Sequence, residues 1–466
     1  MNESGSNQIT NLTRPVQRVS NNAILPSINI DENKKNWVVD ENKTTLRRGG
    51  WWWDHVDPAS WMGDCRDWLR DFRVNHMVLP AAHNAATGYM PAVNIGLRKV
   101  APGTSGGIAW WEVLMRPFLQ YAAQTQHAGV GDLLRLGVRC FDLRILVDDE
   151  EVVFQHGEVK IAHSLSMVVG QVLDFAAAAP LDLVVLYFSH FTTTRGDLVD
   201  RTAHAHVRAA LEPLASVSLP EKCIGETLDH VWTTHPGRSV FVVVDEPNMR
   251  ANDTWADWFV SGDAYRSPYK TPIQSDSATC SAARGGGCIG DEICFLAQQW
   301  EDIDEKYLRC YGPPYMGDQG EGLAPAPPKF FKTLQMHVQA DASFLLQSFV
   351  PCWGNDLRTA AEEVNTRLGT MLMNIPDAYA VNLVEVDFYP LTKSSRLFRS
   401  FLLANWNKHR GPTSGRQEEA AALRRWVDDA HDGVSWVKSA TWTACIIIFI
   451  CVLVALLVLI CKANVF

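Results

Sequence analysis

The stretch Met77–Met90, MVLPAAHNAATGYM, begins with an apolar run and continues into small residues around His83 and Asn84. A short apolar run that breaks at a glycine, here Gly88, is typical of a buried strand leaving its sheet. The sequence therefore predicts a buried strand that ends on a histidine, with very little side-chain bulk around the imidazole.

Six further runs rich in apolar and β-branched residues follow this strand. They are GVRCFDLRILV (137–147), EVVFQHG (151–157), DLVVLYFSHF (182–191), RSVFVVVDE (238–246), KTLQMHV (332–338) and AVNLVEVDFYP (380–390). Helical patterns lie between them, for example at Ser166–Ala178 and Ala360–Met371. Strands that alternate with helices predict an α/β fold with a parallel sheet, and this number of units allows a (β/α) barrel.

The chain has 466 residues and a formal net charge of −10, which argues against a nucleic-acid partner. Residues 1–48 are polar and lack periodicity, so we expect them to be disordered. The globular part is predicted at residues 51–408. The tryptophan-rich stretch Gly49–Met62 is interpreted either as core or as a surface at a lipid interface.

Residues 262–328 are rich in glycine, proline and cysteine and are too long for an ordinary connection, so they are predicted to be an insertion. The cysteines there match no zinc-binding spacing, and both free thiols and disulfides remain open. They are Cys280, Cys288, Cys294 and Cys310.

The C-terminal region contains an uncharged apolar stretch, ACIIIFICVLVALLVLIC, at residues 444–461. A helix of this length spans about 27 Å, close to the hydrocarbon thickness of a bilayer. We therefore expect a linker with a short helix at 409–440 and a membrane anchor at 442–462. Since no signal peptide is evident, a single-pass tail anchor with a cytosolic catalytic part is favoured over a GPI-attachment signal.

Polar side chains gather at the predicted strand ends, where a parallel barrel places its active site. They are His83, Asn84, Asp142, Arg144, His156 and Asp387. Each alone could be structural: a solvated histidine, an Arg144–Asp142 ion pair, or a turn cap at Asp387. Together, two imidazoles and a guanidinium suit phosphoryl transfer without a metal, because one ring removes a proton, the other donates one, and the arginine neutralises charge on phosphorus.

Five segments, in chain order, resemble the X-domain of phosphatidylinositol-specific phospholipases C. They are LPAAHNAATG, LLRLGVRCFDLRI, FQHG, VLDFAAAAPLDLVVLYFSHF and NLVEVDF. The resemblance runs from about Trp61 to Tyr389 and is greatest to the metal-independent group, especially the kinetoplastid GPI-specific phospholipase C subgroup. That subgroup also has His followed by Asn, and a lead-in like Ser60–Met62. The resemblance implies a distorted or incomplete TIM (β/α) barrel of the phospholipase C-like phosphodiesterase type.

The resemblance also implies roles for the matching residues. His83 is the expected general base acting on the inositol 2-hydroxyl, and His156 the general acid for the diacylglycerol oxygen. Arg144 is expected to contact the phosphate where larger eukaryotic members bind calcium, and Asp387 to hydrogen-bond to His83. Supporting or substrate-binding positions are Asn84, Asp142, Gln126, His190 and Gln335. Neither metal nor other cofactor is expected.

The implied reaction cleaves phosphatidylinositol or a GPI glycolipid to diacylglycerol and inositol 1,2-cyclic phosphate. The implied partners are a membrane phospholipid and, through the C-terminal helix, the bilayer. Asn84 cannot ionise, and Ser189, His190 and Asp245 replace basic residues of relatives, which leaves headgroup specificity open. Two alternatives are a metal-dependent phosphodiesterase acting on glycerophosphodiesters and a catalytically inactive, membrane-anchored barrel that binds phosphoinositides or proteins.

Overall fold

A computed structural model describes residues 52–90, 95–97, 120, 123–157, 159–194, 199–266, 330–337, 357–373, 382–392, 395–410, 422 and 425–427. The chain divides into two compact units, residues 1–54 and 55–466, and the first is described only at 52–54. The predicted disordered region 1–48 lies outside the described residues. All strands of the sheet belong to the second unit.

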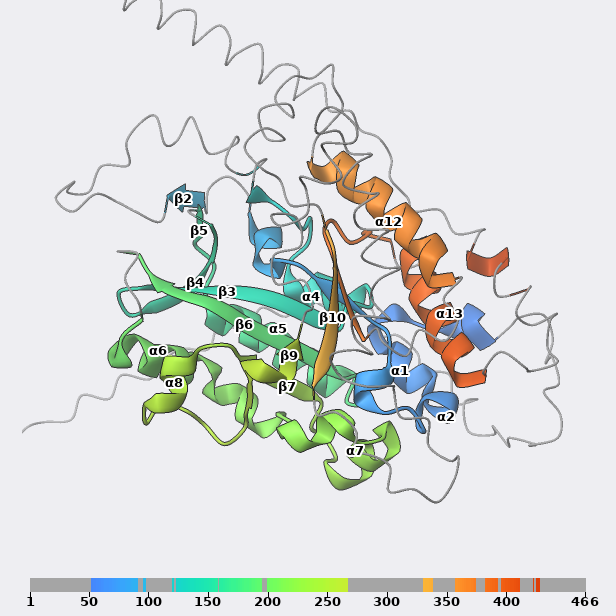
Figure 1. Cartoon of the computed structure of the whole chain (residues 1–466), viewed down its shortest axis with the longest axis horizontal. Helices are drawn as coiled ribbons and strands as arrows, with labels where there is room; N and C mark the ends of the chain where they lie inside the picture. Colours follow the sequence, from blue (N-terminus) through green and yellow to red (C-terminus); the bar gives the residue numbers. More distant parts are fainter. Residues whose placement is uncertain are drawn as a thin grey trace, which may run out of the picture. The chain divides into compact units, whose positions relative to one another are not determined.

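A curled sheet lies at the centre of this unit (Figure 1). In the strand order given next, every neighbouring pair of strands is parallel. Its order is β8 (Phe259–Ser261), β7 (Val240–Val244), β6 (Val184–Thr193), β3 (Cys140–Asp148), β1 (Leu79–Ala82), β11 (Leu383–Val386), β10 (Phe331–Met336) and β9 (Tyr265–Arg266). Within the described residues no ladder joins β8 to β9. The prediction of an α/β fold with a parallel, incomplete barrel is therefore confirmed.

One predicted strand runs in the other direction. β4 (Glu151–His156) is antiparallel to β3, with Ile145 opposite Phe154. The turn between them is only two residues long and includes Asp149 at φ 54°, so it cannot hold the crossover that a parallel neighbour requires. The interpretation of this strand as a further parallel barrel strand is wrong. The hairpin brings the end of β4 back beside the middle of β3.

Two short strands extend the hairpin at the edge of the sheet. β5 (Val159–Ile161) pairs antiparallel with β4, and β2 (Ile95–Leu97) pairs antiparallel with β5. His156, the last residue of β4, lies opposite Val159.

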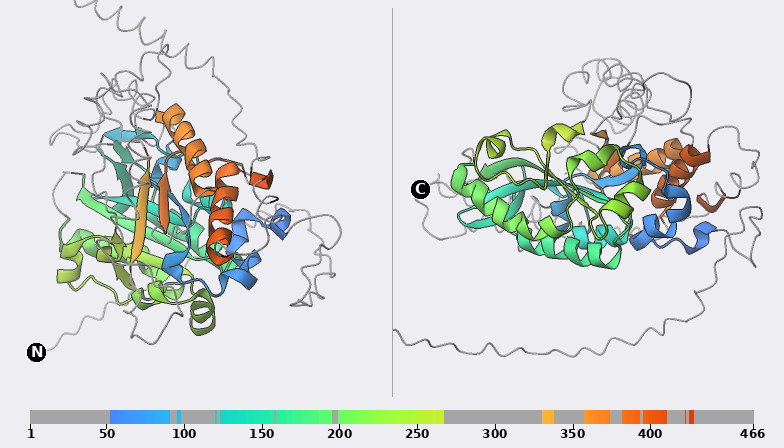
Figure 2. Two further views of the ribbon diagram at one scale, coloured as in Figure 1. Left: turned by 45° about the vertical axis from the view of Figure 1, so that its right-hand side comes forward. Right: turned by 90° about the horizontal axis from the view of Figure 1, so that it is seen from below.

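The helices pack around the sheet, as Figures 1 and 2 show. They are α1 (Trp61–Asp64), α2 (Arg66–Leu69), α4 (Val130–Arg135), α5 (Leu165–Ala178), α6 (Arg201–Leu211), α7 (Leu228–Thr234), α8 (Pro247–Ala251), α12 (Leu357–Met373) and α13 (Arg396–Arg410). Short 3₁₀ segments are η2 (Trp52–His55), η3 (Pro58–Ser60), η4 (Val74–His76), η5 (Ala85–Tyr89), η7 (Glu212–Ser216), η8 (Glu221–Gly225) and η9 (Gly262–Ala264). Side chains of Ser164, Asp200 and Thr227 cap the starts of α5, α6 and α7.

A fully buried ion pair lies near the amino ends of β3 and β6. Arg139 is fully buried, and its Nε and NH2 groups donate to Asp182 at 3.0 and 2.5 Å. The carboxylate of Asp182 also accepts the backbone N–H groups of Met62 and Gly63. This pair joins the segment before β1 to the sheet.

Two further predictions from the sequence, for the tryptophan-rich stretch and for the insertion, can be compared with the structure. Trp61 is buried, which supports the core interpretation for this residue of the stretch Gly49–Met62. Residues 262–266 form η9 and β9 of the sheet and are not part of an insertion, whereas the rest of the predicted insertion lies outside the described residues. So do the four cysteines from Cys280 to Cys310.

The predicted membrane anchor at 442–462, and most of the linker before it, also lie outside the described residues. Among the helices that the structure describes, none has the length and apolar character needed to cross a bilayer.

Candidate active site

Three neighbouring parallel strands end at the same level and each is followed by a polar residue. Ala82 at the end of β1 pairs with Val386 at the end of β11, which pairs with Met336 at the end of β10. The next residues are His83, Asp387 and His337, and all three are buried. Register therefore places the backbone positions of two histidines on either side of that of Asp387.

His83 is held through both ring nitrogens. Its Nδ1 lies 2.8 Å from Oδ1 of Asp387, and its Nε2 lies 3.1 Å from NH2 of Arg144. A guanidinium can only donate, so Nε2 must accept and the proton of the neutral ring is on Nδ1, donated to Asp387. The Nδ2 group of Asn84, 3.0 Å from the same Nε2, supports this tautomer. The lone pair of Nε2 is thus directed toward Arg144.

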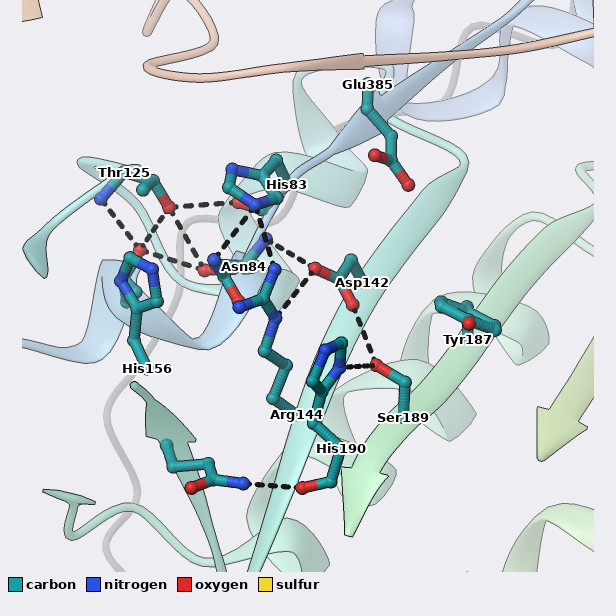
Figure 3. A network of polar contacts seen from close by, with 12 residues as sticks. His83, Asn84, Thr125, Asp142, Arg144, His156, Tyr187, Ser189, His190 and Glu385 are labelled. Carbon is teal, nitrogen blue, oxygen red and sulfur yellow. Dashed lines mark hydrogen bonds and ion pairs between the residues drawn. The ribbon is translucent and has the colours of Figure 1, made fainter. Parts of the chain in front are cut away.

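Arg144 extends from β3 toward the end of β1 (Figure 3). Its Nε lies 3.4 Å from Oδ2 of Asp142, which also accepts the backbone N–H of Asn84 at 3.2 Å. Asn84 has a left-handed backbone at φ 44°, a conformation that asparagine tolerates better than most residues. Asp142 thus holds the loop after β1 and the guanidinium together.

His156 reaches the site because β4 turns back along β3. Its Nδ1 donates to the carbonyl of Ala123 at 2.6 Å, which leaves Nε2 as the nitrogen available for chemistry. The ring centroids of His83 and His156 are 6.2 Å apart and the rings are nearly perpendicular, at 83°. Figure 3 shows the two imidazoles in one group with the Arg144 guanidinium, which contacts His83.

Burial determines the ionisation of these groups. Burial, together with the positive charge of Arg144, lowers the pKa of both His83 and His156 to about 3, so both rings are neutral at pH 7. Burial raises the pKa of Asp387 to about 7, against the opposing influence of His337 and Arg144. Burial also acts to raise the pKa of Asp142, but Arg144, His83, His190 and the backbone N–H of Asn84 together outweigh it and hold that pKa below its ordinary value.

Gln126 hydrogen-bonds to the backbone of two loops of the site. Its Nε2 donates to the carbonyls of His83 (3.2 Å) and Val386 (2.8 Å), and its Oε1 accepts the N–H of Tyr389 at 3.1 Å. Fully buried, it joins the loops that carry His83 and Asp387. Its contacts are those of a positioning residue, in agreement with the supporting role expected for it.

The other supporting positions lie around the Arg144 side of the site or deeper in the barrel. Exposed His190 occupies a bulge of β6 at φ 53°, and its Nδ1 is 2.8 Å from Oγ of Ser189, which itself donates to Asp142 at 3.3 Å. Gln335 of β10 pairs in register with Glu385 and hydrogen-bonds to it, so it does not reach the two catalytic candidates directly.

Sequence reasoning missed two residues, His337 and Glu385. The His337 ring stacks on His83, with centroids 3.7 Å apart and planes 3° apart. Glu385 is buried and accepts the hydroxyl of Tyr265, and burial raises its pKa to about 7. Alternation along a strand places Glu385 on the same face as Asp387, two residues later, so period-2 spacing could have identified it.

A second polar pair lies on β6 and after β7. The hydroxyl of Tyr187 donates to Oδ2 of Asp245 at 2.6 Å, and the Tyr187 ring stacks on Tyr265 with centroids 3.8 Å apart. The Asp245 carboxylate is therefore held against Tyr187.

One cluster has the composition of a metal site. His83, His337 and Asp387 each offer a ligand atom, and these atoms all lie within 4.8 Å of one another. The expectation of no metal stays a prediction.

Solved structures similar to this chain include the phosphatidylinositol-specific phospholipase C of Listeria monocytogenes. It matches at 12% identity with a TM-score of 0.45, over 72% of this chain and 97% of that chain. Two mutants of the phosphatidylinositol-specific phospholipase C of Staphylococcus aureus match at 12% identity, with TM-scores of 0.43 and 0.45, over 71% and 75% of this chain and 92% and 96% of theirs. No protein-family model matches the sequence, and no curated protein matches it significantly. The likeness concerns the fold, whereas the chemistry depends on the geometry of the site itself.

Proposed function

We propose that this chain is a phospholipase C-type phosphodiesterase that cleaves phosphatidylinositol or a GPI glycolipid, without calcium, to diacylglycerol and inositol 1,2-cyclic phosphate. One observation carries the proposal: two imidazoles, each with Nδ1 engaged by an acceptor, lie 6.2 Å apart, and a guanidinium contacts one of them. This leaves both Nε2 atoms for proton transfer around a group that binds phosphate.

His83 acts as the base. Its Nε2 lone pair takes the proton of the inositol 2-hydroxyl as that oxygen attacks phosphorus. Proton uptake makes the ring cationic, and the Asp387 carboxylate at 2.8 Å stabilises the cation. Burial favours the neutral ring before the reaction, so the lone pair is present at neutral pH.

His156 acts as the acid. It gives a proton from Nε2 to the glycerol oxygen as the bond between that oxygen and phosphorus breaks. In the free protein this ring is neutral, because burial lowers its pKa to about 3. The negative charge of a bound phosphodiester favours the protonated ring, so we expect His156 to take up its proton when the substrate binds.

Arg144 balances the charge that develops on the phosphate oxygens. Its guanidinium supplies a positive charge where a divalent cation would otherwise be needed. Asp142 orients this side chain through the 3.4 Å contact to Nε. In the reaction one phosphorus–oxygen bond forms and one breaks. His83 takes the proton of the inositol hydroxyl, His156 gives its own proton to diacylglycerol, and His83 then releases its proton to solvent, so that protons balance over the cycle.

The proposal includes the membrane as the place of action. The predicted anchor at 442–462 would hold the catalytic unit, on the cytosolic side, at the surface that contains the lipid. Tethering of this kind raises the local substrate concentration without any new contact. Deletion of residues 442–466 is expected to release the protein from membranes, whereas turnover of detergent-dispersed lipid should continue.

The decisive experiment gives detergent-solubilised full-length protein three substrates: phosphatidylinositol, a GPI-anchored protein and phosphatidylcholine. Each is incubated with and without EGTA, and cyclic inositol phosphate is measured. We expect product from the first or second substrate, undiminished by EGTA, and none from phosphatidylcholine. Activity that requires added calcium would contradict the role of Arg144, and lack of any cyclic product would contradict the whole proposal.

A further inference from the structure

The three residues that follow β1, β11 and β10 at one level form a cluster that the proposed reaction uses only in part. His83 and Asp387 have roles in it, but His337 has none. We propose that His83, His337 and Asp387 form a binding site for a divalent transition-metal ion of the zinc class, and that the bound ion inhibits the phosphodiesterase. The inhibitory part rests on the proposed function, whereas the binding site does not.

The donor set fits this class of ion. Two imidazoles and one carboxylate suit zinc and its first-row neighbours, whereas calcium and magnesium favour sites made entirely of oxygen ligands. Register fixes the three residues on adjacent strands, so they approach one point from rigid elements of the sheet. All three are buried, which would exclude most solvent from a bound ion.

Unpartnered polar atoms give an independent indication. Among the described residues, neither ring nitrogen of His337 has a hydrogen-bond partner, nor has Oδ2 of Asp387 or Oε2 of Glu385. Buried polar groups without protein partners are uncommon, and a bound ion or water commonly satisfies those that occur. The charged group nearest to His337 is Glu385, with 3.8 Å between Nε2 and Oε2, and this carboxylate is the one closest to a fourth ligand position.

Binding needs a local movement. Two ligand atoms on one tetrahedral zinc ion lie about 3.4 Å apart, given Zn–N distances of about 2.1 Å. The ligand atoms here lie within 4.8 Å of one another, and the stacked rings direct their in-plane lone pairs side by side. His337 must therefore rotate out of the stack to coordinate, and no hydrogen bond to the described residues opposes that rotation.

Coordination would remove the base. A metal ion bound by both His83 and Asp387 must coordinate His83 through Nδ1, the nitrogen that faces Asp387. Without the ion, this nitrogen carries the proton that is donated to Asp387. A neutral imidazole that coordinates through Nδ1 carries its proton on Nε2, so the lone pair that accepts the substrate proton disappears. The new Nε2–H would also face the N–H groups of Arg144 and Asn84, so the two hydrogen bonds that Nε2 accepts from them would be lost. Occupancy and catalysis are therefore mutually exclusive.

The binding test uses full-length, detergent-solubilised protein stripped with chelator and then titrated with Co²⁺ or Zn²⁺. Cysteines are alkylated first, because thiolates elsewhere in the chain could also bind these ions. We expect one Co²⁺ equivalent with d–d absorption and no thiolate charge-transfer band. His337→Phe preserves an aromatic ring against His83 but removes the ligand, and should weaken Zn²⁺ binding beyond the about 100-fold that loss of an outer-shell partner costs.

The matched control is His163→Phe. His163 also belongs to a stacked pair, with its ring centroid 3.7 Å from that of Tyr89, but it has no place in the cluster. This variant should bind Co²⁺ and Zn²⁺ like the wild type. Circular dichroism checks that each variant folds, and if His337→Phe does not, the spectrum of the alkylated wild type still decides whether a non-thiolate site exists.

The activity test measures cyclic inositol phosphate production as Zn²⁺ is added, with each protein compared with its own metal-free rate. We expect at least about tenfold inhibition at saturating zinc in the wild type and in His163→Phe, and much weaker inhibition in His337→Phe. Absence of a non-thiolate site, unchanged binding by His337→Phe, or stimulation by zinc would overturn the proposal. If the wild type cleaves no lipid but binds Zn²⁺, and His337→Phe binds it much more weakly, the proposed function fails and the binding site is confirmed.

Discussion

NH2 of Arg144 lies 3.1 Å from Nε2 of His83. Because a guanidinium has no acceptor, this contact fixes which nitrogen of the neutral imidazole carries the proton. It also places a permanent positive charge beside the atom proposed to receive the substrate proton. One side chain thus determines the tautomer of the base and supplies the charge for the phosphate.

Replacement of Arg144 tests whether this side chain supplies the positive charge for the phosphate. Arg144→Gln should lower kcat by about 10²–10³-fold, or about 2.7–4 kcal/mol, the usual cost of removing one donor that stabilises developing charge. Arg144→Lys should lose less, because it retains the charge but not the planar fork. Steady-state kinetics on phosphatidylinositol measures both, and unchanged kcat in Arg144→Gln would remove this residue from the mechanism.

The two histidines can be distinguished by the leaving group. His83→Ala and His156→Ala should each reduce turnover of phosphatidylinositol by about 10²–10⁴-fold. A synthetic inositol phosphodiester with a phenolic leaving group needs no general acid, so His156→Ala should recover much of its rate on that substrate and His83→Ala should not. Equal recovery in both variants would contradict the assignment of base and acid.

Asp387 is predicted to act through His83. In Asp387→Asn the amide can donate to Nδ1, which favours the tautomer with the proton on Nε2 and leaves no lone pair for the substrate. We expect kcat to fall by about 10²–10⁴-fold with little change in KM, and nitrogen chemical shifts of His83 to report the changed tautomer. Asp245→Asn is the control, since that carboxylate contacts Tyr187 instead. A wild-type tautomer in Asp387→Asn would be inconsistent with this role.

The buried pair Arg139–Asp182 should dominate stability. Arg139→Met leaves the Asp182 carboxylate in the interior without its cation and should lower the free energy of unfolding by about 3–5 kcal/mol. The exposed pair Arg201–Asp253 is the comparison, and Arg201→Met should cost less than about 1 kcal/mol. Urea unfolding gives both values. Similar values for the two variants would show that burial of the first pair does not matter.

Acid should destabilise the fold through its buried histidines. Burial lowers the pKa of His76 to about 3 and that of His127 to about 4, from an ordinary value of 6.5. At pH values between 6.5 and these lowered pKa values, the unfolded chain binds more protons than the folded chain. The free energy of unfolding therefore falls as the pH decreases from 6.5 toward 4. Glu385 and Asp387, with pKa values raised to about 7, act in the opposite direction. They do not offset the histidines, because burial also lowers the pKa values of His83, His156 and His337 to about 3.

Urea midpoints at pH 7 and pH 5 measure this effect. His76→Gln removes one contributing group and should reduce the pH dependence of the unfolding free energy by up to about 1.4 kcal/mol per pH unit. His230→Gln, at an exposed position, is the control and should change it little. Equal midpoints at the two pH values in the wild type would show that the histidines are not the main titrating groups.

Much of the site could be predicted because it depends on local pattern. The apolar runs before His83 and Asp387 identify buried strands, and residues that follow parallel strands collect at one edge of the sheet. The expected contact between His83 and Asp387 is present at 2.8 Å. His156 was also expected at the site, but for a different reason, since β4 returns along β3 in a hairpin.

The sequence by itself determined the longer strands and the polar side chains at their ends, because alternation and turn residues act over a few neighbouring positions. The short strands β2, β5, β8 and β9 were not predicted. Only the tertiary structure decided which strand ends lie side by side. Strand order and register depend on how whole faces of the sheet and its helices pack, over separations of hundreds of residues. That is why the stack of His337 on His83 could not be predicted from the sequence, although it becomes possible once β10, β11 and β1 are aligned.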